Sequence, residues 1–312
     1  MIYRKLGKAG VKISVVGIGT NRFGSDKTSQ SEVNQIIDHA MELGINHLDS
    51  ANVYQDGNSE SVLGNALKGK WDRFFLATKF FFPTGDGIND RGASRYHIFN
   101  AVEASLTRLQ SDHIDLYYIH RWDTETPIEE TLQTLDMLLQ QGKVRYIGAS
   151  DFAAWQLAKA NLLAELKGWN AFVAAQSHFH MFERNLEKEV VPYCQSENMA
   201  IIPYFPLAGG FLTGKYQQGK PAPAGSRGES SEYVQKYMTD DNFSKLEKLT
   251  KFAQDHERQM NELASAWLMA QPQVASVISG ATSLQHVTQN AKASDWVLSQ
   301  TDLEEITSIL DG

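Results

Sequence analysis

Three short stretches decide the fold of this chain: HLDSANVY at residues 47–54, FLATK at 75–79 and IDLYYIH at 114–120. They supply four ionisable side chains at or just beyond apolar runs, namely Asp49, Tyr54, Lys79 and His120. These side chains can meet only if the three runs are parallel, neighbouring strands. A barrel of alternating strands and helices meets this condition at its C-terminal face. The pattern therefore predicts an active site at the mouth of a β/α barrel.

The same unit repeats along the chain. Apolar strand candidates alternate with stretches whose apolar residues recur three or four positions apart, which is typical of helices. The predicted strands are 15–19, 47–49, 74–79, 114–119, 144–149, 172–177, 200–204 and 274–279, and the clearest helices are 31–43, 94–109, 128–140 and 186–197. Such an alternation predicts an α/β protein.

Polar strand ends separate a barrel from an open, doubly wound sheet. An open sheet gathers ligand groups at one crevice, whereas a barrel brings the end of every strand to one centre. Nearly every predicted strand ends in polar or glycine residues: Gly19, Thr20 and Asn21; Asp49; Lys79; His120; Ser150 and Asp151; Gln176; Tyr204; and Gly280. We therefore predict a (β/α)8 TIM barrel as a single domain over residues 1–312. A hairpin over 2–14 is expected at its closed end, and a long loop over 212–239 follows the seventh strand.

Composition limits the partners. The formal net charge is −8, which argues against a nucleic-acid partner. Cys194 is the single cysteine, so no intrachain disulfide can form and a reducing compartment is indicated. No stretch reaches the roughly 20 apolar residues of a spanning helix. We expect a cytoplasmic protein without a membrane partner, and the sequence leaves its oligomeric state open.

The four side chains suit a site that polarises a carbonyl group and donates a proton. A tyrosine phenol has a pKa of about 10, so nearby positive charge is needed to favour the phenolate, and Lys79 can supply it. Asp49 would keep the lysine charged, and His120 can hydrogen-bond the same substrate oxygen. Reduction of a carbonyl also needs a hydride, which no side chain donates. A nicotinamide or flavin cofactor is therefore implied.

Two other functions fit the barrel. His178 and His180 alternate on one predicted strand, and with His47, Asp49 and His120 they could form the metal site of a barrel hydrolase. An unligated ammonium on the neighbouring strand counts against that site. A non-catalytic small-molecule sensor could use the same barrel.

Several motifs resemble the aldo-keto reductase superfamily over essentially the whole chain. LDSANVYQDGNSE at 48–60 is similar to the family segment D-T-A-x-x-Y-G-x-G-x-S-E, with Ser50 in place of threonine. PYFPLAGGFLTGKY at 203–216 is similar to a run of the longer-chain members, which include potassium-channel beta subunits. DLYYIHRWD and the closing GATSLQHVTQN at 280–290 follow in order. The resemblance implies a barrel with Tyr54 as general acid, tuned by Lys79 and Asp49, while His120 positions the carbonyl.

The resemblance also implies that NADPH binds in an extended form without a Rossmann domain. Its site would comprise Gly19, Thr20, Asn21, Asp49, Ser150, Asp151, Gln176, Tyr204, Phe205, Leu207, Gly210, Lys215, Arg227, Gly280, Thr282, Gln285, Gln289 and Asn290. Tyr204 would stack on the nicotinamide ring. Lys215 and Arg227 would reach the adenosine phosphate, which favours NADPH over NADH.

The substrate pocket is expected to be aromatic and apolar. Its predicted residues are Phe23, Tyr54, Phe81, Phe82, His120 and Trp122, and small aldehydes or ketones are the expected substrates. Two positions depart from the family pattern. Asp151 replaces an asparagine and cannot donate a hydrogen bond, so weaker cofactor binding is expected. QSHFH at 176–180 differs from the usual Q-x-x-Y-N.

Overall fold

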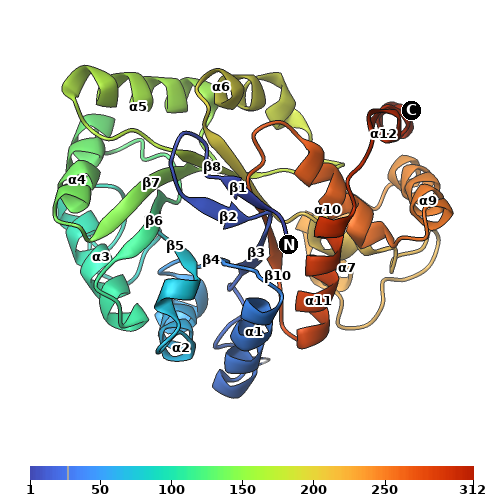
Figure 1. Ribbon diagram of the computed structural model, residues 1–312, viewed down its shortest axis with the longest axis horizontal. Coiled ribbons are helices and arrows are strands. Elements are labelled where there is room, and N and C mark those ends of the chain that lie inside the picture. The colour runs from blue at the N-terminus through green and yellow to red at the C-terminus, as the bar shows by residue number, and fades with distance from the viewer. Residues whose placement is uncertain (27) are drawn as a thin grey trace.

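The computed structural model describes residues 1–26 and 28–312, and within them eight parallel strands close into a barrel (Figure 1). The strands pair in sequence order, and β10 closes the ring by pairing with both β3 and β9. Their bounds are β3 (Val16–Gly19), β4 (His47–Asp49), β5 (Phe75–Phe80), β6 (Ile114–Ile119), β7 (Val144–Ser150), β8 (Ala174–His178), β9 (Ala200–Tyr204) and β10 (Val277–Gly280). The predicted TIM barrel is confirmed.

Helices surround the barrel (Figure 1). They are α1 (Gln30–Glu42), α2 (Asn58–Ala66), α3 (Arg95–Leu109), α4 (Ile128–Gln140), α5 (Ala154–Lys167), α6 (Val190–Ser196), α9 (Asp240–Asp255), α10 (Met260–Ala270), α11 (Leu284–Lys292) and α12 (Gln300–Asp311). Local sequence fixes several starts. Ser29 begins α1 with a reciprocal capping box to Glu32, and Ser94 caps α3 by accepting from the backbone N–H of His97.

Two predicted strands start too early. The apolar runs over 172–177 and 274–279 predict longer strands than β8 and β10. Phe172 is buried, but its backbone N–H donates to Asn161 Oδ1 at 3.0 Å instead of to a neighbouring strand. Val274 makes only an isolated bridge to Ile201. An apolar sequence predicts burial but does not predict strand pairing. Phe172 and Val274 are both buried, although they lie before the first residues of β8 and β10.

The segment 1–14 closes one end of the barrel. Strands β1 (Tyr3–Lys5) and β2 (Lys12–Ser14) form the predicted antiparallel hairpin. Leu6 and Ile13 are fully buried and pack against the inward-facing residues of the barrel, including Leu116 and Ile202. Gly7 adopts φ +56°, and a Cβ there would lie 2.6 Å from the backbone nitrogen of Ala200. The hairpin therefore fits tightly against the closed end.

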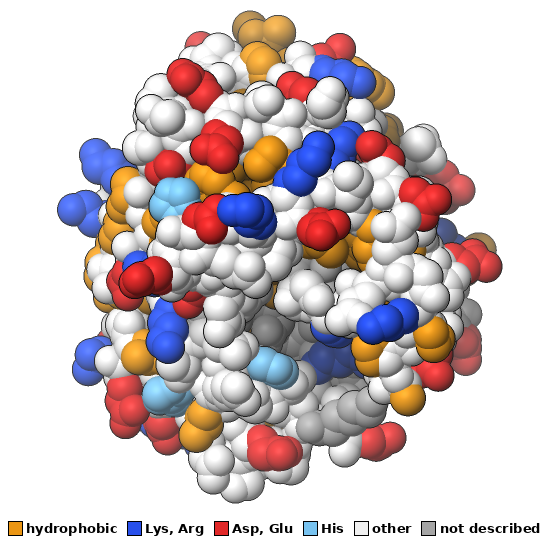
Figure 2. Space-filling view, turned by 90° about the vertical axis from the view of Figure 1, so that its right-hand side faces the viewer, with side chains coloured by type: hydrophobic (Ala, Val, Ile, Leu, Met, Phe, Trp, Pro, Cys, Tyr) orange, Lys and Arg blue, Asp and Glu red, His pale blue; other side chains and the backbone are white. Residues whose placement is uncertain are grey.

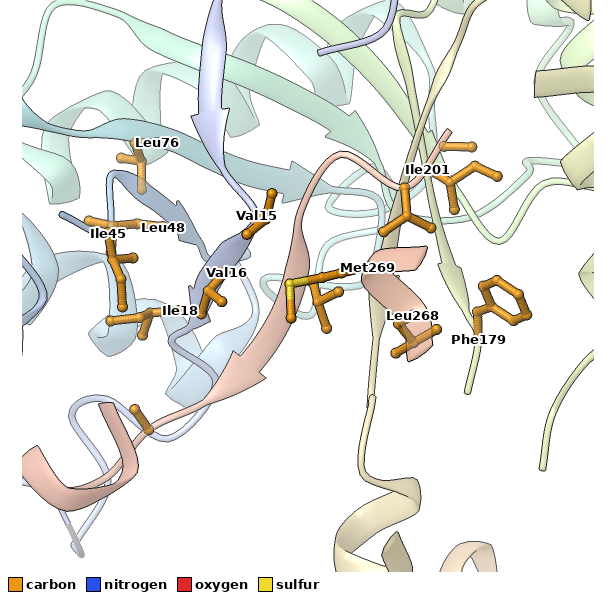
Figure 3. Close-up of a cluster of buried hydrophobic side chains, with 14 of the residues drawn as sticks. Val15, Val16, Ile18, Ile45, Leu48, Leu76, Phe179, Ile201, Leu268 and Met269 are labelled. Carbon is orange, nitrogen blue, oxygen red and sulfur yellow. The ribbon is translucent and has the colours of Figure 1, made fainter. Parts of the chain in front are cut away.

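The larger part of the core lies between the strands and the helices. Figure 3 shows Val16, Ile18 and Leu48 on neighbouring strands, and Leu268 and Met269 of α10 belong to the same buried cluster as Ile201. Inward-facing residues form a second cluster inside the barrel, so both faces of the sheet are apolar. This packing on both sides fixes the strand ends and hence the side chains at the mouth.

The segment after β9 is more ordered than a plain loop. It contains the 3-10 turn η4 (Ala208–Thr213) and the short helices α7 (Arg227–Ser230) and α8 (Glu232–Gln235) before α9 begins. Its glycines and prolines correctly place a long connection over 212–239, but they hide these short helices. No helix among the described residues has the length and apolar character needed to cross a membrane.

Candidate active site

A cavity of about 610 Å³ opens at the C-terminal ends of the barrel strands. Figure 2 shows a face of the molecule that is hollowed, with histidine and Lys or Arg side chains in the hollow. Most of the predicted site residues line the cavity: Gly19, Asn21, Asp49, Tyr54, His120, Ser150, Asp151, Gln176, Tyr204, Phe205, Leu207, Gly210, Lys215, Arg227, Gly280, Thr282, Gln289 and Asn290. Strand ends and the segment after β9 thus contribute to one site.

Lys79 lies beneath the cavity floor and is fully buried. Its ammonium donates to Asp49 Oδ2 at 2.6 Å, to the carbonyl oxygen of Ser50 at 2.6 Å and to Tyr54 Oη at 3.5 Å. An ammonium has three N–H groups, and each has an acceptor here. The side chain of Gln176 donates to the other Asp49 oxygen at 2.7 Å. Asp49 therefore joins the lysine to the opposite side of the barrel.

The protonation states suit a proton donor. Burial lowers the pKa of Lys79, but Asp49 and Tyr54 more than offset this, so its pKa is raised and it stays charged. Burial raises the pKa of Tyr54, and this outweighs the lowering by Lys79. The lysine acts in the predicted direction, but burial has the larger effect on the pKa of this phenol. The phenol keeps its proton, and the nearby ammonium is placed to stabilise the phenolate that remains after proton transfer.

His120 is a neutral group in this site. Burial, followed by the charges of Lys79 and Arg121, lowers the pKa of His120 to about 2. Its ring lies edge-on to the Tyr54 ring at a centroid distance of 6.2 Å. Its buried Nδ1 has no hydrogen-bond partner in the described part of the chain. A neutral imidazole beside the phenol can donate one hydrogen bond to an oxygen held between them.

Asp151 is held by three donors. The guanidinium of Arg121 and the hydroxyl of Tyr204, the latter at 2.9 Å, both donate to Oδ2, and the backbone N–H of His178 donates to Oδ1 at 3.3 Å. Burial raises the pKa of Asp151 despite the lowering effect of Arg121. Sequence reasoning missed Arg121, although it directly follows His120 at a strand end.

Positive charge gathers at the part of the cavity formed by the segment after β9. The Lys215 ammonium lies against Gly210, where a Cβ would be 2.8 Å from Nζ. The Arg227 guanidinium lies over the Phe205 ring at 5.3 Å. Burial, followed by the charge of Arg22, lowers the pKa of Arg227. Among the described residues, no ion pair involves Arg22, Lys215 or Arg227. Arg22 also lines the cavity and was missed, because loop cations are common.

Six predicted ligand contacts lie outside the cavity wall, and three of them are Phe23, Thr20 and Gln285. Phe23 is fully buried in the main core, so its assignment to the substrate pocket is wrong. Thr20 is also fully buried, and its hydroxyl donates to the Asp49 carbonyl oxygen at 3.1 Å. Gln285 is exposed on α11, whereas Gln289 one turn later lines the cavity. These positions share a loop or helix with true wall residues but face other directions.

The predicted aromatic residues around the substrate divide into two groups. Phe82 lies with its ring 4.8 Å from the His120 ring, and Phe81 contacts Phe82 at 5.5 Å. Trp122 instead packs on Phe152 at 5.1 Å and on a neighbouring tryptophan, and it does not line the cavity. Phe81 and Phe82 do not line the cavity either, so the segment after β5 supplies an aromatic contact to His120 but no part of the cavity wall.

The structure does not bring the candidate metal ligands together. His47 Nδ1 lies 2.9 Å from Ser276 Oγ inside the barrel, and burial lowers the pKa of His47 to about 4. His178 and His180 contact aromatic rings of the segment after β9. Over residues 1–26 and 28–312, no group of three His, Cys, Asp or Glu side chains is placed to hold a metal ion.

A closed barrel with a Tyr, Lys, Asp and His set at its mouth is the arrangement expected of a barrel oxidoreductase. Residues 15–311 match the model of the Aldo/keto reductase family, and the chain belongs to this family. It is 34% identical over 302 residues to a probable voltage-gated potassium channel subunit beta of Arabidopsis thaliana, covering 95% of this chain and 92% of that protein. It is 33% identical over 325 residues to the uncharacterized oxidoreductase YrpG of Bacillus subtilis (strain 168), covering 100% and 97%.

A named reductase is also similar. The versiconal hemiacetal acetate reductase of Aspergillus parasiticus is 32% identical over 298 residues, covering 87% of this chain and 86% of that protein. The similarity of the chain to reductases supports oxidoreductase activity at the level of the family.

Proposed function

We propose that this protein reduces small aldehydes or ketones to alcohols with NADPH, and that Tyr54 is the general acid. One observation carries the proposal. The Tyr54 hydroxyl lies 3.5 Å from the buried Lys79 ammonium, whose charge is maintained by Asp49. A protonated phenol next to a fixed positive charge is suited to give up its proton during the reaction and not before it.

The side chains divide the work on the substrate. The carbonyl oxygen would lie between Tyr54 and His120, where both can donate hydrogen bonds. As negative charge develops on this oxygen, the phenol transfers its proton to it, and Lys79 stabilises the phenolate. Neutral His120 orients the carbonyl without competing as an acid, since its pKa is lowered to about 2. Asp49 and Lys79 are buried at the floor of the cavity, where water is excluded, and this strengthens each of these electrostatic interactions.

The cavity fits an extended nicotinamide dinucleotide. A reduced nicotinamide supplies the hydride that the side chains cannot. Ser150, Gln176 and Tyr204 lie at the catalytic part of the cavity and would hold the nicotinamide. Lys215 and Arg227 have no carboxylate partner among the described residues, which suits the phosphate groups of a polyanionic ligand. The number of these cations supports NADPH over NADH.

The test is a panel of aldehydes and ketones with NADPH, in which turnover is measured as the loss of NADPH absorbance. We expect turnover by the purified protein, and we expect it to continue after exhaustive treatment with a chelator. Turnover that is lost on chelation and restored by zinc would contradict a mechanism in which Tyr54 and Lys79 act without a metal ion. Tight NADPH binding without reduction of any carbonyl would favour the sensor alternative.

A further inference from the structure

We propose that the substrate carries a carboxylate a few bonds from its carbonyl group, and that Arg121 binds this carboxylate. The inference rests on the proposed function, because the carbonyl position between Tyr54 and His120 is taken from it. It adds a substrate class and a specificity-determining residue to that site.

Arg121 lies in the wall of the cavity that holds the proposed carbonyl position. It directly follows His120 after β6, and both residues line the same cavity as Tyr54. The Arg121 side chain is 45% exposed, so an incoming ligand can reach it. Its charge is also close enough to lower the pKa of His120. A group bound by this guanidinium would therefore belong to the same small molecule as the reacting carbonyl.

The guanidinium is held in one orientation before a ligand binds. One of its terminal nitrogens, Nη1, donates to Asp151. Asp151 cannot turn easily, because Tyr204 and the backbone N–H of His178 also donate to its carboxylate. A guanidinium anchored in this way loses less conformational entropy when it binds a second partner. The Asp151 carboxylate therefore acts as a support for the cation.

Donor groups remain available on Arg121. A guanidinium has five N–H groups, and the contacts described here involve only Nη1. Within the described residues, neither Nε nor Nη2 of Arg121 has a hydrogen-bond acceptor. By contrast, Arg108 uses both Nε and Nη2 on the buried Glu60, as expected for a structural arginine. The free edge of Arg121 matches the two oxygens of a carboxylate.

The surrounding charges permit an anion at this place. Of the two carboxylates that line this part of the cavity, Asp49 is paired with Lys79. The other is Asp151, whose charge is shared among three donors. The Phe82 ring lies 4.8 Å from the His120 ring and gives this residue an apolar neighbour. An aromatic or short aliphatic aldehyde with a terminal carboxylate fits this combination.

The experiment compares matched substrate pairs with NADPH. Para-carboxybenzaldehyde is compared with its methyl ester, and succinic semialdehyde with its methyl ester, by kcat/KM at constant ionic strength. We expect the acids to be preferred by about tenfold, since a partly exposed charge-assisted contact supplies discrimination of this order. The ratio of acid to ester is the readout, because it cancels general damage to the enzyme.

Four variants test whether Arg121 causes the preference for the acid, measured as the acid-to-ester ratio of kcat/KM. Arg121→Gln should bring the ratio close to one. Arg121→Gln combined with Asp151→Asn should do the same while leaving no unpaired buried carboxylate. Arg121→Lys should retain part of the preference, because it keeps the charge but loses the fork of donors. Arg73→Gln, an exposed arginine before β5, is the matched control and should leave the ratio unchanged.

Binding supplies a readout that does not need turnover. With oxidised cofactor present, the acid should bind more tightly than its ester to the wild-type protein and not to the Arg121→Gln variant. Equal kcat/KM values for acid and ester in the wild-type protein would overturn the inference while leaving the proposed carbonyl reduction intact. A preference that survives Arg121→Gln would also overturn it. Failure to reduce any carbonyl, with no difference in binding, would overturn both.

Discussion

The Asp49 carboxylate lies 2.6 Å from the Lys79 ammonium, and the two side chains are 3% and 0% exposed. Removing one member of such a pair leaves a buried charge without a partner. We therefore expect Asp49→Asn to destabilise the protein by about 3–5 kcal/mol, measured by urea unfolding. Lys79→Met should have a cost of the same order.

The double variant provides the control for this pair. Asp49→Asn combined with Lys79→Met removes both charges, so it should be less destabilised than the sum of the single variants. If the destabilisation of the double variant equals the sum of the two single destabilisations, Asp49 and Lys79 are not energetically coupled.

Tyr54→Phe should abolish carbonyl reduction and leave NADPH binding nearly unchanged. The change removes one hydroxyl group and keeps the ring, so only the proton donor is lost. We expect kcat to fall by about 10²–10⁴, measured with saturating substrate, while cofactor fluorescence gives an unchanged Kd. The control is Tyr96→Phe on α3, whose side chain is 63% exposed. A wild-type rate for the Tyr54 variant would exclude this residue as the acid.

Lys215→Ala combined with Arg227→Ala should weaken NADPH binding more than NADH binding. If these cations hold the additional phosphate, each contact contributes about 1.5–3 kcal/mol, and less where solvent reaches it. The selectivity is measured by titrating both cofactors at fixed ionic strength. Lys220→Ala, an exposed lysine of the same segment, is the matched control. An equal loss for both cofactors would contradict contact with that phosphate.

Acid should destabilise the fold before the carboxylates titrate. Burial lowers the pKa of His47 to about 4, below its unfolded value of about 6.5. The neutral form is therefore favoured in the folded state, and its contribution is present above pH 6.5 and lost as the pH falls towards 4. This difference corresponds to a loss on the order of 3 kcal/mol.

Burial also lowers the pKa values of His120, His178 and His180, so His47 accounts for only part of the slope of stability against pH. Between about pH 6.5 and 4, His47→Asn should flatten this slope, even if the variant is less stable throughout. His286→Asn, on the exposed side of α11, is the matched control. An unchanged slope in the His47 variant would mean that another buried group causes the acid sensitivity.

The strand order and the meeting of Asp49, Tyr54, Lys79 and His120 could be predicted because they depend on local pattern. Each apolar run ends in a polar residue, and barrel geometry alone then brings Asp49, Lys79 and His120 together. Phe23 could not be placed, because its apolar character is equally suited to a pocket wall and to the core that contains it. Only the direction of its side chain decides, and no periodic pattern exists in that turn.

The pKa values and ion pairs of the site could not be predicted from the sequence. The raised pKa of Tyr54 follows from burial outweighing a nearby ammonium, and the extent of burial is a property of the assembled barrel. The anchoring of Arg121 by Asp151 likewise joins residues 30 positions apart that carry no shared motif. Contacts of this kind depend on side-chain orientation, which the sequence pattern does not specify.

The hairpin at the closed end has a consequence for proton supply. Leu6 and Ile13, with the apolar side chains around them, separate the floor of the site from solvent at that end. Hydrocarbon side chains cannot relay protons. If Tyr54 delivers a proton in each catalytic cycle, its replacement must therefore arrive from the side by which substrate enters. The exchange of ligands and the recharging of the acid would then share one opening, so a ligand that fills the mouth would also delay reprotonation of the phenolate.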